Sequence, residues 1–240
     1  MELQRGIHEG FVQFFEAPTR ETLRDLLRVN LGETDQLDFK ESWPDLVKMA
    51  KHVIAIGNSG GGAIVIGVKE RNDGSLTPVG LDRLLDKSDI GDEFEKYVPS
   101  GLKYEVIQFD LSASEYAKIE GDRYQVVLVY PDKKEVPYLP KREGSGIKQN
   151  RIYVRRDTKS VEANRPEIER LIKGKVNAIA SSVGGELEDD LRQLKTLCDQ
   201  RYGSVGSTMT SLATRNDLYN GILDGLIEEK VNQIRQRIGV

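Results

Sequence analysis

Three acidic residues and one lysine have the types and spacing to act on a phosphate group. Glu33 and Asp38 are separated by four residues, and Glu70 follows the next apolar run along the chain. Carboxylate oxygens without histidine or cysteine partners are the ligands that Mg²⁺ or Mn²⁺ prefers. A metal held in this way would neutralise a scissile phosphate and lower the pKa of a bound water or ribose hydroxyl.

Lys40 extends this candidate site. It lies two residues after Asp38, so the alternation of a strand would put both side chains on the same side. Its ammonium group could contact a phosphate or stabilise developing negative charge. The alternative is that the three acids are solvated surface residues, because the chain contains 39 acidic residues in all. Spacing alone favours that alternative, and convergence requires that the strands carrying these residues be neighbours.

The elements that must position these residues are visible in the hydrophobic pattern. Residues 37–40 alternate apolar and charged side chains, which is typical of a short strand. Pro44 is expected to start a helix that runs to about Gly57. The run 63–68 is apolar on both faces, which indicates a central strand covered from both sides.

The rest of the chain predicts a mixture of strands and helices, followed by helices alone. Strand signals disappear after Lys175, where leucines recur at helical spacing. We therefore expect an α/β (α+β) fold with a mixed β-sheet, flanking helices and a C-terminal helical appendage. The expected divisions are N-terminal helices at 1–30, an α/β domain at 31–175 and a helical region at 176–240. Further strands are expected at 104–109, 124–130 and 151–155, and helices at 2–16, 19–29, 90–97, 166–171 and 218–238.

A basic segment provides the second candidate for function. Residues 133–159 contain nine lysines and arginines against three acids, although the whole chain has a net charge of −4. Tyr138 and Tyr153 are interleaved with them, a combination that suits phosphate contacts and base stacking. A solvated loop is the alternative. The residues expected to bind nucleic acid are Lys133, Lys134, Lys141, Arg142, Lys148, Arg151, Tyr153, Arg155 and Arg156.

Composition excludes several other classes of site. The single cysteine, Cys198, allows no internal disulfide and no cysteine zinc cage. The longest apolar runs are strand-length, so we expect no membrane partner, and the charged N-terminus does not read as a secretion signal. A cytoplasmic location is therefore expected. His52 could act as a general base, but a structural or surface histidine is the favoured interpretation.

The glycine run Gly60-Gly61-Gly62 has two interpretations. Its backbone N–H groups could hold a phosphate, but it follows a helix instead of opening one and lacks the Lys-Ser/Thr ending of an ATP-binding loop. We favour a tight helix-to-strand turn that needs positive φ and close packing, and we expect no ATP as cofactor.

The order of these features resembles the Schlafen AlbA-like domain family. Glu33-x4-Asp38-Phe39-Lys40 is followed by a helix, by Asn58-Ser59-Gly60-Gly61 and by an apolar strand that closes in Gly67-Val68 before Glu70. The family pattern is a glutamate, four residues and Glu-Phe-Lys, then a helix ending in Ala-Asn-Thr/Ser-x-Gly-Gly, and an apolar strand ending in Gly-Val and an acid. Residues 136–138, 151–155 and 163–166 resemble the closing strand and helix. The resemblance covers about residues 30–173.

The resemblance implies a Schlafen-core-like, nucleic-acid-binding domain from a prokaryotic member. In animal members with nuclease activity, three acids cleave structured RNA such as tRNA with a divalent metal, and their positions match Glu33, Asp38 and Glu70. Two acids depart from the pattern, since Asp38 replaces a glutamate and Glu70 replaces an aspartate, which would shift the metal geometry. Animal nucleases pair two such domains into a clamp, so this chain would need a homodimer. Many prokaryotic members are described only as DNA-binding or regulatory.

Three functional hypotheses follow. The first is a metal-dependent endoribonuclease that acts on folded RNA, with Glu33, Asp38 and Glu70 on Mg²⁺ or Mn²⁺ and Lys40 at the phosphate. The second is a non-catalytic DNA- or RNA-binding regulatory module. The third is an effector subunit of a prokaryotic defence complex that docks a partner protein through its helical ends. RNA is favoured over DNA as the partner.

Overall fold

The chain forms two compact units. The computed structural model describes residues 2–28, 34–71, 75–112, 116–156, 158–202 and 213–238. The units are Met1–Lys175, which contains the strands, and Val176–Val240, whose described residues are helical. Helix α5 (Arg165–Tyr202) begins in the first unit and continues into the second, which also contains α6 (Ala213–Ile238). The expected α/β fold with a C-terminal helical appendage is confirmed.

A four-stranded mixed sheet forms the centre of the first unit. Its strand order is β1-β2-β6-β5. Strands β1 and β2 are parallel neighbours, and the other two pairings are antiparallel. The parallel pairing places Asp38 opposite Ile64 and Lys40 opposite Ile66. The bounds are β1 (Leu37–Lys40), β2 (Gly62–Ile66), β5 (Lys103–Asp110) and β6 (Arg123–Tyr130).

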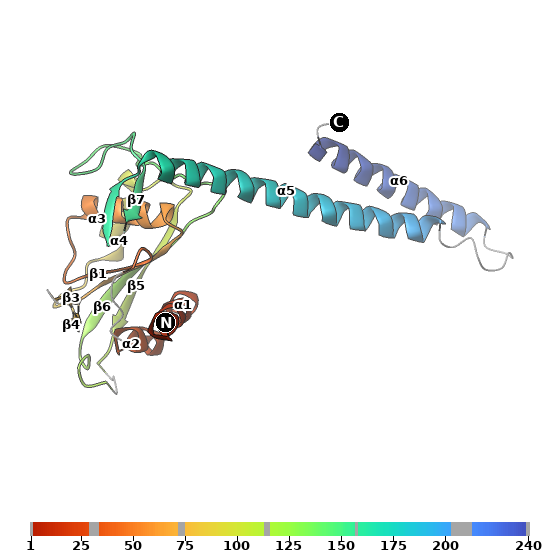
Figure 1. Cartoon of the computed structure of the whole chain (residues 1–240). Helices are drawn as coiled ribbons and strands as arrows, with labels where there is room; N and C mark the ends of the chain where they lie inside the picture. The colour runs from red at the N-terminus through yellow and green to blue at the C-terminus, as the bar shows by residue number, and fades with distance from the viewer. Residues whose placement is uncertain are drawn as a thin grey trace. The chain divides into compact units, whose positions relative to one another are not determined.

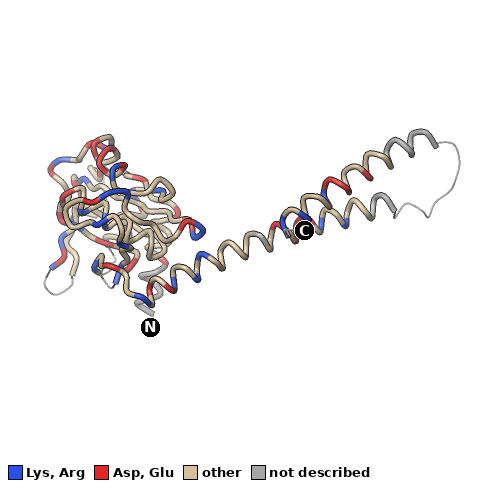
Figure 2. The backbone as a smooth tube through the Cα atoms, turned by 90° about the horizontal axis from the view of Figure 1, so that it is seen from above, with Lys and Arg blue, Asp and Glu red and all other residues tan. Residues whose placement is uncertain are grey.

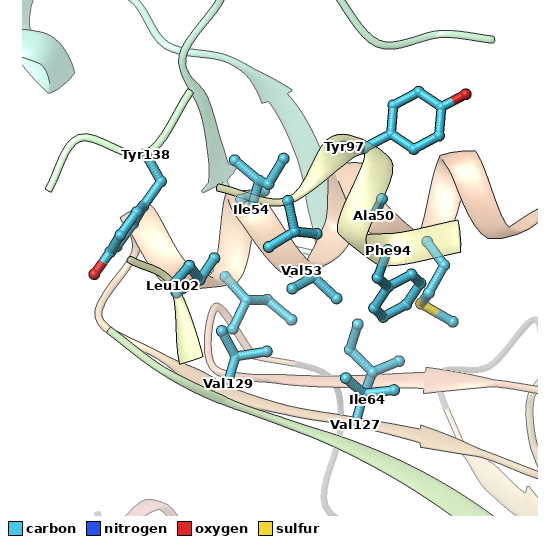
Figure 3. Packing of buried hydrophobic residues seen from close by; sticks show 14 of the residues in the cluster. Ala50, Val53, Ile54, Ile64, Phe94, Tyr97, Leu102, Val127, Val129 and Tyr138 are labelled. Carbon is cyan, nitrogen blue, oxygen red and sulfur yellow. The ribbon is translucent and has the colours of Figure 1, made fainter. Parts of the chain in front are cut away.

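Helices cover both faces of this sheet (Figure 1). Helices α3 (Leu46–Asn58) and α4 (Lys87–Tyr97) lie on one face, and α1 (Glu2–Glu16) and α2 (Arg20–Arg28) lie on the other. Alternate residues of β2 enter the two hydrophobic clusters. Ile64 packs with α3 and α4 (Figure 3), and Val65 packs with α1 and α2. All of β2 is buried, which confirms the expected central strand.

Two short hairpins complete the first unit. Strand β3 (Val68–Glu70) pairs with β4 (Leu76–Pro78), and β7 (Tyr153–Arg156) pairs with β8 (Lys159–Glu162). The single strand expected at 63–68 is divided, because Gly67 adopts a φ of +110° between β2 and β3. The β7–β8 hairpin packs against α3, which brings the basic segment next to β1 and its acidic residue.

The glycine run makes a tight turn between α3 and β2. Gly61 has a φ of +88° and Gly62 a φ of +153°. A Cβ atom on Gly62 would lie 2.0 Å from the carbonyl oxygen of Gln36, and one on Gly61 would lie 2.6 Å from Pro131 Cδ. Side chains are therefore excluded by backbone and ring atoms, as expected for a close-packed turn.

Candidate functional site

Asp38 lies in a buried group of charges at the edge strand β1. Its side chain is completely buried, and its Oδ1 accepts hydrogen bonds from Lys40 Nζ at 2.7 Å and from Arg155 Nη2 at 3.3 Å. Arg155 is also completely buried at its side chain, whereas Lys40 is 27% exposed. Lys40 therefore lies on the same side of the strand as Asp38, as the alternation predicts, and connects the buried carboxylate to solvent.

A histidine and a serine extend this group. Nδ1 of His52, on α3, lies 2.7 Å from Ser160 Oγ on β8, and Arg155 Nη1 donates to the same hydroxyl at 3.4 Å. The five residues Asp38, Lys40, His52, Arg155 and Ser160 are called the Asp38 cluster below. The helix-to-strand turn holds the cluster in place, because the backbone N–H of Arg155 donates to Ser59 Oγ at 2.8 Å.

His52 is uncharged at neutral pH. Burial lowers the pKa of its imidazole to about 4, and the nearby cations Lys40, Arg155 and Lys51 act in the same direction. The Asp38 carboxylate opposes this shift but does not overcome it. The neutral ring therefore makes a structural hydrogen bond to Ser160 and is a weak base, which supports the structural interpretation of this histidine.

A polar hollow adjoins the cluster at Ser160. It has a volume of about 290 Å³, and its lining residues are Lys51, Gly144, Gly146, Ile147, Lys148, Tyr153, Ser160 and Glu162. Lys51 Nζ lies 5.9 Å from the centre of the Tyr153 ring. This opening, called the Lys51 hollow, combines two ammonium groups with a hydroxyl and one acid. Sequence reasoning missed Lys51, although its spacing from Lys48 marks a basic stripe on α3.

Among the described residues of the expected site, the structure pairs Asp38 with Lys40 but does not join Asp38 to Glu70. Glu33 lies outside the described residues. Glu70 is exposed at the end of β3, six residues after Ile64, the partner of Asp38 in the sheet. Within the described ranges, no hydrogen bond or ion pair joins Glu70 to Asp38, and no three His, Cys, Asp or Glu residues are grouped for a metal. Carboxylates suit Mg²⁺ or Mn²⁺ chemically, but Asp38 and Glu70 do not form such a site without Glu33.

Most of the expected nucleic-acid-binding residues are exposed cations. Lys133, Lys134, Lys148 and Arg151 are exposed. Charges of both signs are interspersed over the rest of this unit (Figure 2), so the basic segment is a local feature. Some of its members already have partners. Arg156 pairs with Glu167 at 2.8 Å, Lys141 Nζ donates to the Glu95 carbonyl, and Arg142 lies over the Tyr97 ring.

Two members of the basic segment lie in the interior. Arg155 contacts Asp38 and does not reach the surface. Tyr153 is 4% exposed and belongs to the core that packs on α3, and its hydroxyl accepts a hydrogen bond from the Lys148 N–H at 2.9 Å. Tyr138 is also buried. Burial of both rings leaves little ring surface for stacking on bases, in contrast to the role expected for these tyrosines.

Comparison with known proteins identifies the family. The fold is a two-sided α/β sheet with a charged cluster at its edge, and the family model "Schlafen, AlbA_2" matches residues 33–164, more than half of the chain. The chain belongs to the Schlafen AlbA_2 family, as its motifs indicated. Membership of this family points to a nucleic-acid-related function.

The other comparisons show only distant likeness. No curated protein matches the chain. Among solved structures, the chain is similar to the DIP2311 protein from Corynebacterium diphtheriae, with 16% sequence identity and a TM-score of 0.39. The match covers 57% of this chain and 23% of that one, so the chain spans less than a quarter of the matched protein.

In the described part of the chain, no helix combines the length and apolar character that a membrane span requires.

Removing Arg155 should destabilise the protein strongly. The Arg155→Ala substitution leaves a buried carboxylate without one of its cations, and a broken buried pair costs about 3–5 kcal/mol. Arg165→Ala is the matched control, because Arg165 pairs with Glu169 at the surface with its side chain 89% exposed, and such pairs contribute about 1 kcal/mol or less. Urea unfolding of both variants measures the difference. Equal losses of stability in the two variants would show that the buried contact with Asp38 contributes no more than a surface ion pair.

Acidification should destabilise the protein partly through His52. The pKa of His52 in the folded protein is about 4, below the ordinary value of about 6.5. Between these two pH values, the unfolded chain therefore binds the proton more readily than the folded protein does. Stability from this group is therefore complete above about pH 6.5 and decreases as the pH falls toward 4. Urea unfolding at pH 7 and pH 5 should show a smaller pH effect in His52→Gln than in the wild type. Parallel losses in both proteins would contradict this origin.

Proposed function

We propose that this chain binds folded RNA such as tRNA through phosphate contacts at the Lys51 hollow and the neighbouring basic segment. The observation that carries the proposal is the hollow itself, where Lys51 and Lys148 face an opening beside the Asp38 cluster. Ammonium groups that line an opening suit a nucleic-acid backbone, because phosphate contacts dominate affinity. The family supports nucleic acid as the partner.

Exposed cations along the same segment would extend the contact. Lys133, Lys134 and Arg151 are exposed and belong to the same basic segment as Lys148 of the hollow. Because their charges are already in water, pairing with phosphates releases counterions with little desolvation. Such contacts fix the position of an RNA and do not read its sequence. The preference for RNA over DNA rests on the family resemblance, so both are included in the test.

Removing the two lysines of the hollow should weaken RNA binding. We expect the Lys51→Ala/Lys148→Ala variant to bind tRNA at least about tenfold more weakly, with a salt dependence reduced by roughly two phosphate contacts. Fluorescence anisotropy at several salt concentrations, with tRNA and duplex DNA, measures this.

A second double variant provides the control for this experiment. Lys87 and Lys103 are exposed on α4 and β5, so Lys87→Ala/Lys103→Ala removes the same charge from other elements. Equal losses in the two double variants would reduce the effect to net charge and argue against the hollow as the site.

Metal-dependent cleavage of the bound RNA is the second candidate function. Lys40 favours it, because its ammonium group is partly exposed and lies 2.7 Å from Asp38 Oδ1, where it could contact a phosphate at this edge of the sheet. Glu33, Asp38 and Glu70 would hold Mg²⁺ or Mn²⁺, which would neutralise the scissile phosphate and activate a water molecule. Lys40 would stabilise negative charge that develops on the phosphate oxygens. Gripping one RNA from two sides would require a homodimer, since the chain has a single domain of this kind.

Glu70 allows cleavage to be tested without disturbing the core. It is exposed, so Glu70→Gln should leave stability and tRNA binding unchanged but lower Mn²⁺-dependent cleavage by about a hundredfold or more. Glu105→Gln, at another exposed acid, is the matched control. Cleavage is followed on denaturing gels with Mn²⁺, Mg²⁺ or EDTA. If the wild type binds tRNA but never cuts it, the protein is a non-catalytic binding module.

A further inference from the structure

A second pocket, larger than the Lys51 hollow, lies beside the helix-to-strand turn. Its volume is about 400 Å³, and it lies within the first unit between the end of α1, the end of β6 and the first turns of α5. We call it the Tyr130 pocket. Its size is that of a site for one small ligand and not for a folded macromolecule.

One wall of the Tyr130 pocket is aromatic. The rings of Phe15 and Tyr130 lie with centroids 5.0 Å apart and planes tilted by 43°. Both rings are only partly buried, unlike Tyr138 and Tyr153. Pro131 and Leu171 add further apolar surface. The pocket therefore offers faces against which a flat, apolar ring can pack.

The polar groups of the pocket are cationic. Lys133, Arg170 and Lys175 contribute to its lining, and none of the lining residues, all of them described, is acidic. Within the described ranges, no hydrogen bond or ion pair engages the side chains of these three residues. Positive charge around an apolar pocket selects a ligand that combines a flat ring with an anion.

The pocket has little capacity to read the edge of a ring. Asn58 is its one amide side chain, and both ends of that amide are occupied. Nδ2 donates to the carbonyl oxygens of Tyr138 and Tyr153, each at 2.9 Å, and Oδ1 accepts from the Tyr138 N–H at 2.7 Å. Recognition by ring stacking and charge, without edge contacts, tolerates every base.

The Tyr130 pocket is connected to the candidate RNA-binding surface. Lys133 belongs both to the pocket and to the basic segment. Ser59, which lies between the lining residues Asn58 and Gly60, holds the backbone of Arg155 in the Asp38 cluster. A nucleic acid that contacts Lys133 on the basic segment would therefore also contact the lining of the Tyr130 pocket.

We propose that the Tyr130 pocket binds a nucleoside phosphate, with the base against Phe15 and Tyr130 and the phosphate at Lys133, Arg170 and Lys175. The ligand is either an unstacked nucleotide of a bound RNA or a free mononucleotide, which share this chemistry. The inference deepens the proposed function and, for the RNA-borne ligand, rests on it.

Three substitutions test the pocket. Tyr130→Ala removes the stacking ring, and Tyr130→Phe retains it. Gly174→Phe fills the pocket without removing a contact, because a Cβ on Gly174 meets nothing within 4 Å and the residue lies in helix α5. Thermal unfolding by circular dichroism verifies that each variant is folded, so Gly174→Phe keeps the test informative if Tyr130→Ala does not fold.

Binding is measured with two probes, AMP by calorimetry and a fluorescent single-stranded RNA by anisotropy. We expect Tyr130→Ala and Gly174→Phe to weaken binding at least about tenfold, and Tyr130→Phe to stay within about twofold of the wild type. Loss with AMP alone identifies a free nucleotide as the ligand. A loss of binding with RNA alone identifies an unstacked nucleotide of the RNA as the ligand. In that case, removing one base from the RNA should abolish the difference between the variants and the wild type.

The outcomes separate this inference from the proposed function. If Gly174→Phe binds RNA as well as the wild type does and AMP binds to neither, the pocket inference is overturned while RNA binding stands. If the wild type binds no RNA, the proposed function fails, and AMP binding that is lost in Gly174→Phe still supports the pocket. If the wild type binds neither AMP nor any RNA, tRNA included, both proposals are overturned.

Discussion

A sheet covered on both faces leaves no place for an uncompensated charge, and this constraint determines how the site is built. Two hydrophobic clusters enclose β2 and β6. A carboxylate on the neighbouring strand can be buried only with cations and hydrogen-bond donors. Asp38 is in this position, and Lys40 and Arg155 supply the charges. The position of the β7–β8 hairpin is therefore linked to the charge of one residue on β1.

Apolar packing and polar contacts determine different parts of the structure of the first unit. The clusters on the two faces of the sheet set the layers of helices and strands. The polar contacts hold parts of the segment 138–160 against α3 and the turn that follows it. Asn58 bonds to the backbone of Tyr138 and Tyr153. Ser59 bonds to the backbone of Arg155, and His52 bonds to Ser160. Because these bonds are buried or partly buried, each broken one would leave a polar group without a partner. The surface that carries the proposed phosphate contacts is thus held by a small set of hydrogen bonds.

Periodicity predicted the layers well because it records burial directly. Most of the run 63–68, apolar on both faces, forms the central strand β2, and the alternation of Asp38 and Lys40 placed both on one side. Long-range pairing leaves no such local signal. Arg155 read as a surface cation, although it lies 117 positions from its partner Asp38. The aromatic and aliphatic neighbours Tyr153 and Val154 were the available hint that this strand enters the core. The short strands β4 and β8 lacked a pattern long enough to detect.

The contacts of the turn at Asn58 constrain the order in which parts of the protein can fold during synthesis. The Asn58 amide side chain forms hydrogen bonds with residues 80 and 95 positions later in the chain. Asp38 and its partner Arg155 are separated by 117 positions. A ribosome synthesises the chain from the N-terminus, so the first 130 residues can bury their sheet well before these contacts exist. The Asp38 cluster is completed only when Ser160 has emerged from the exit tunnel. Until Arg155 emerges, Asp38 lacks the arginine that compensates its charge, and the nascent domain has an incomplete edge that later residues must seal.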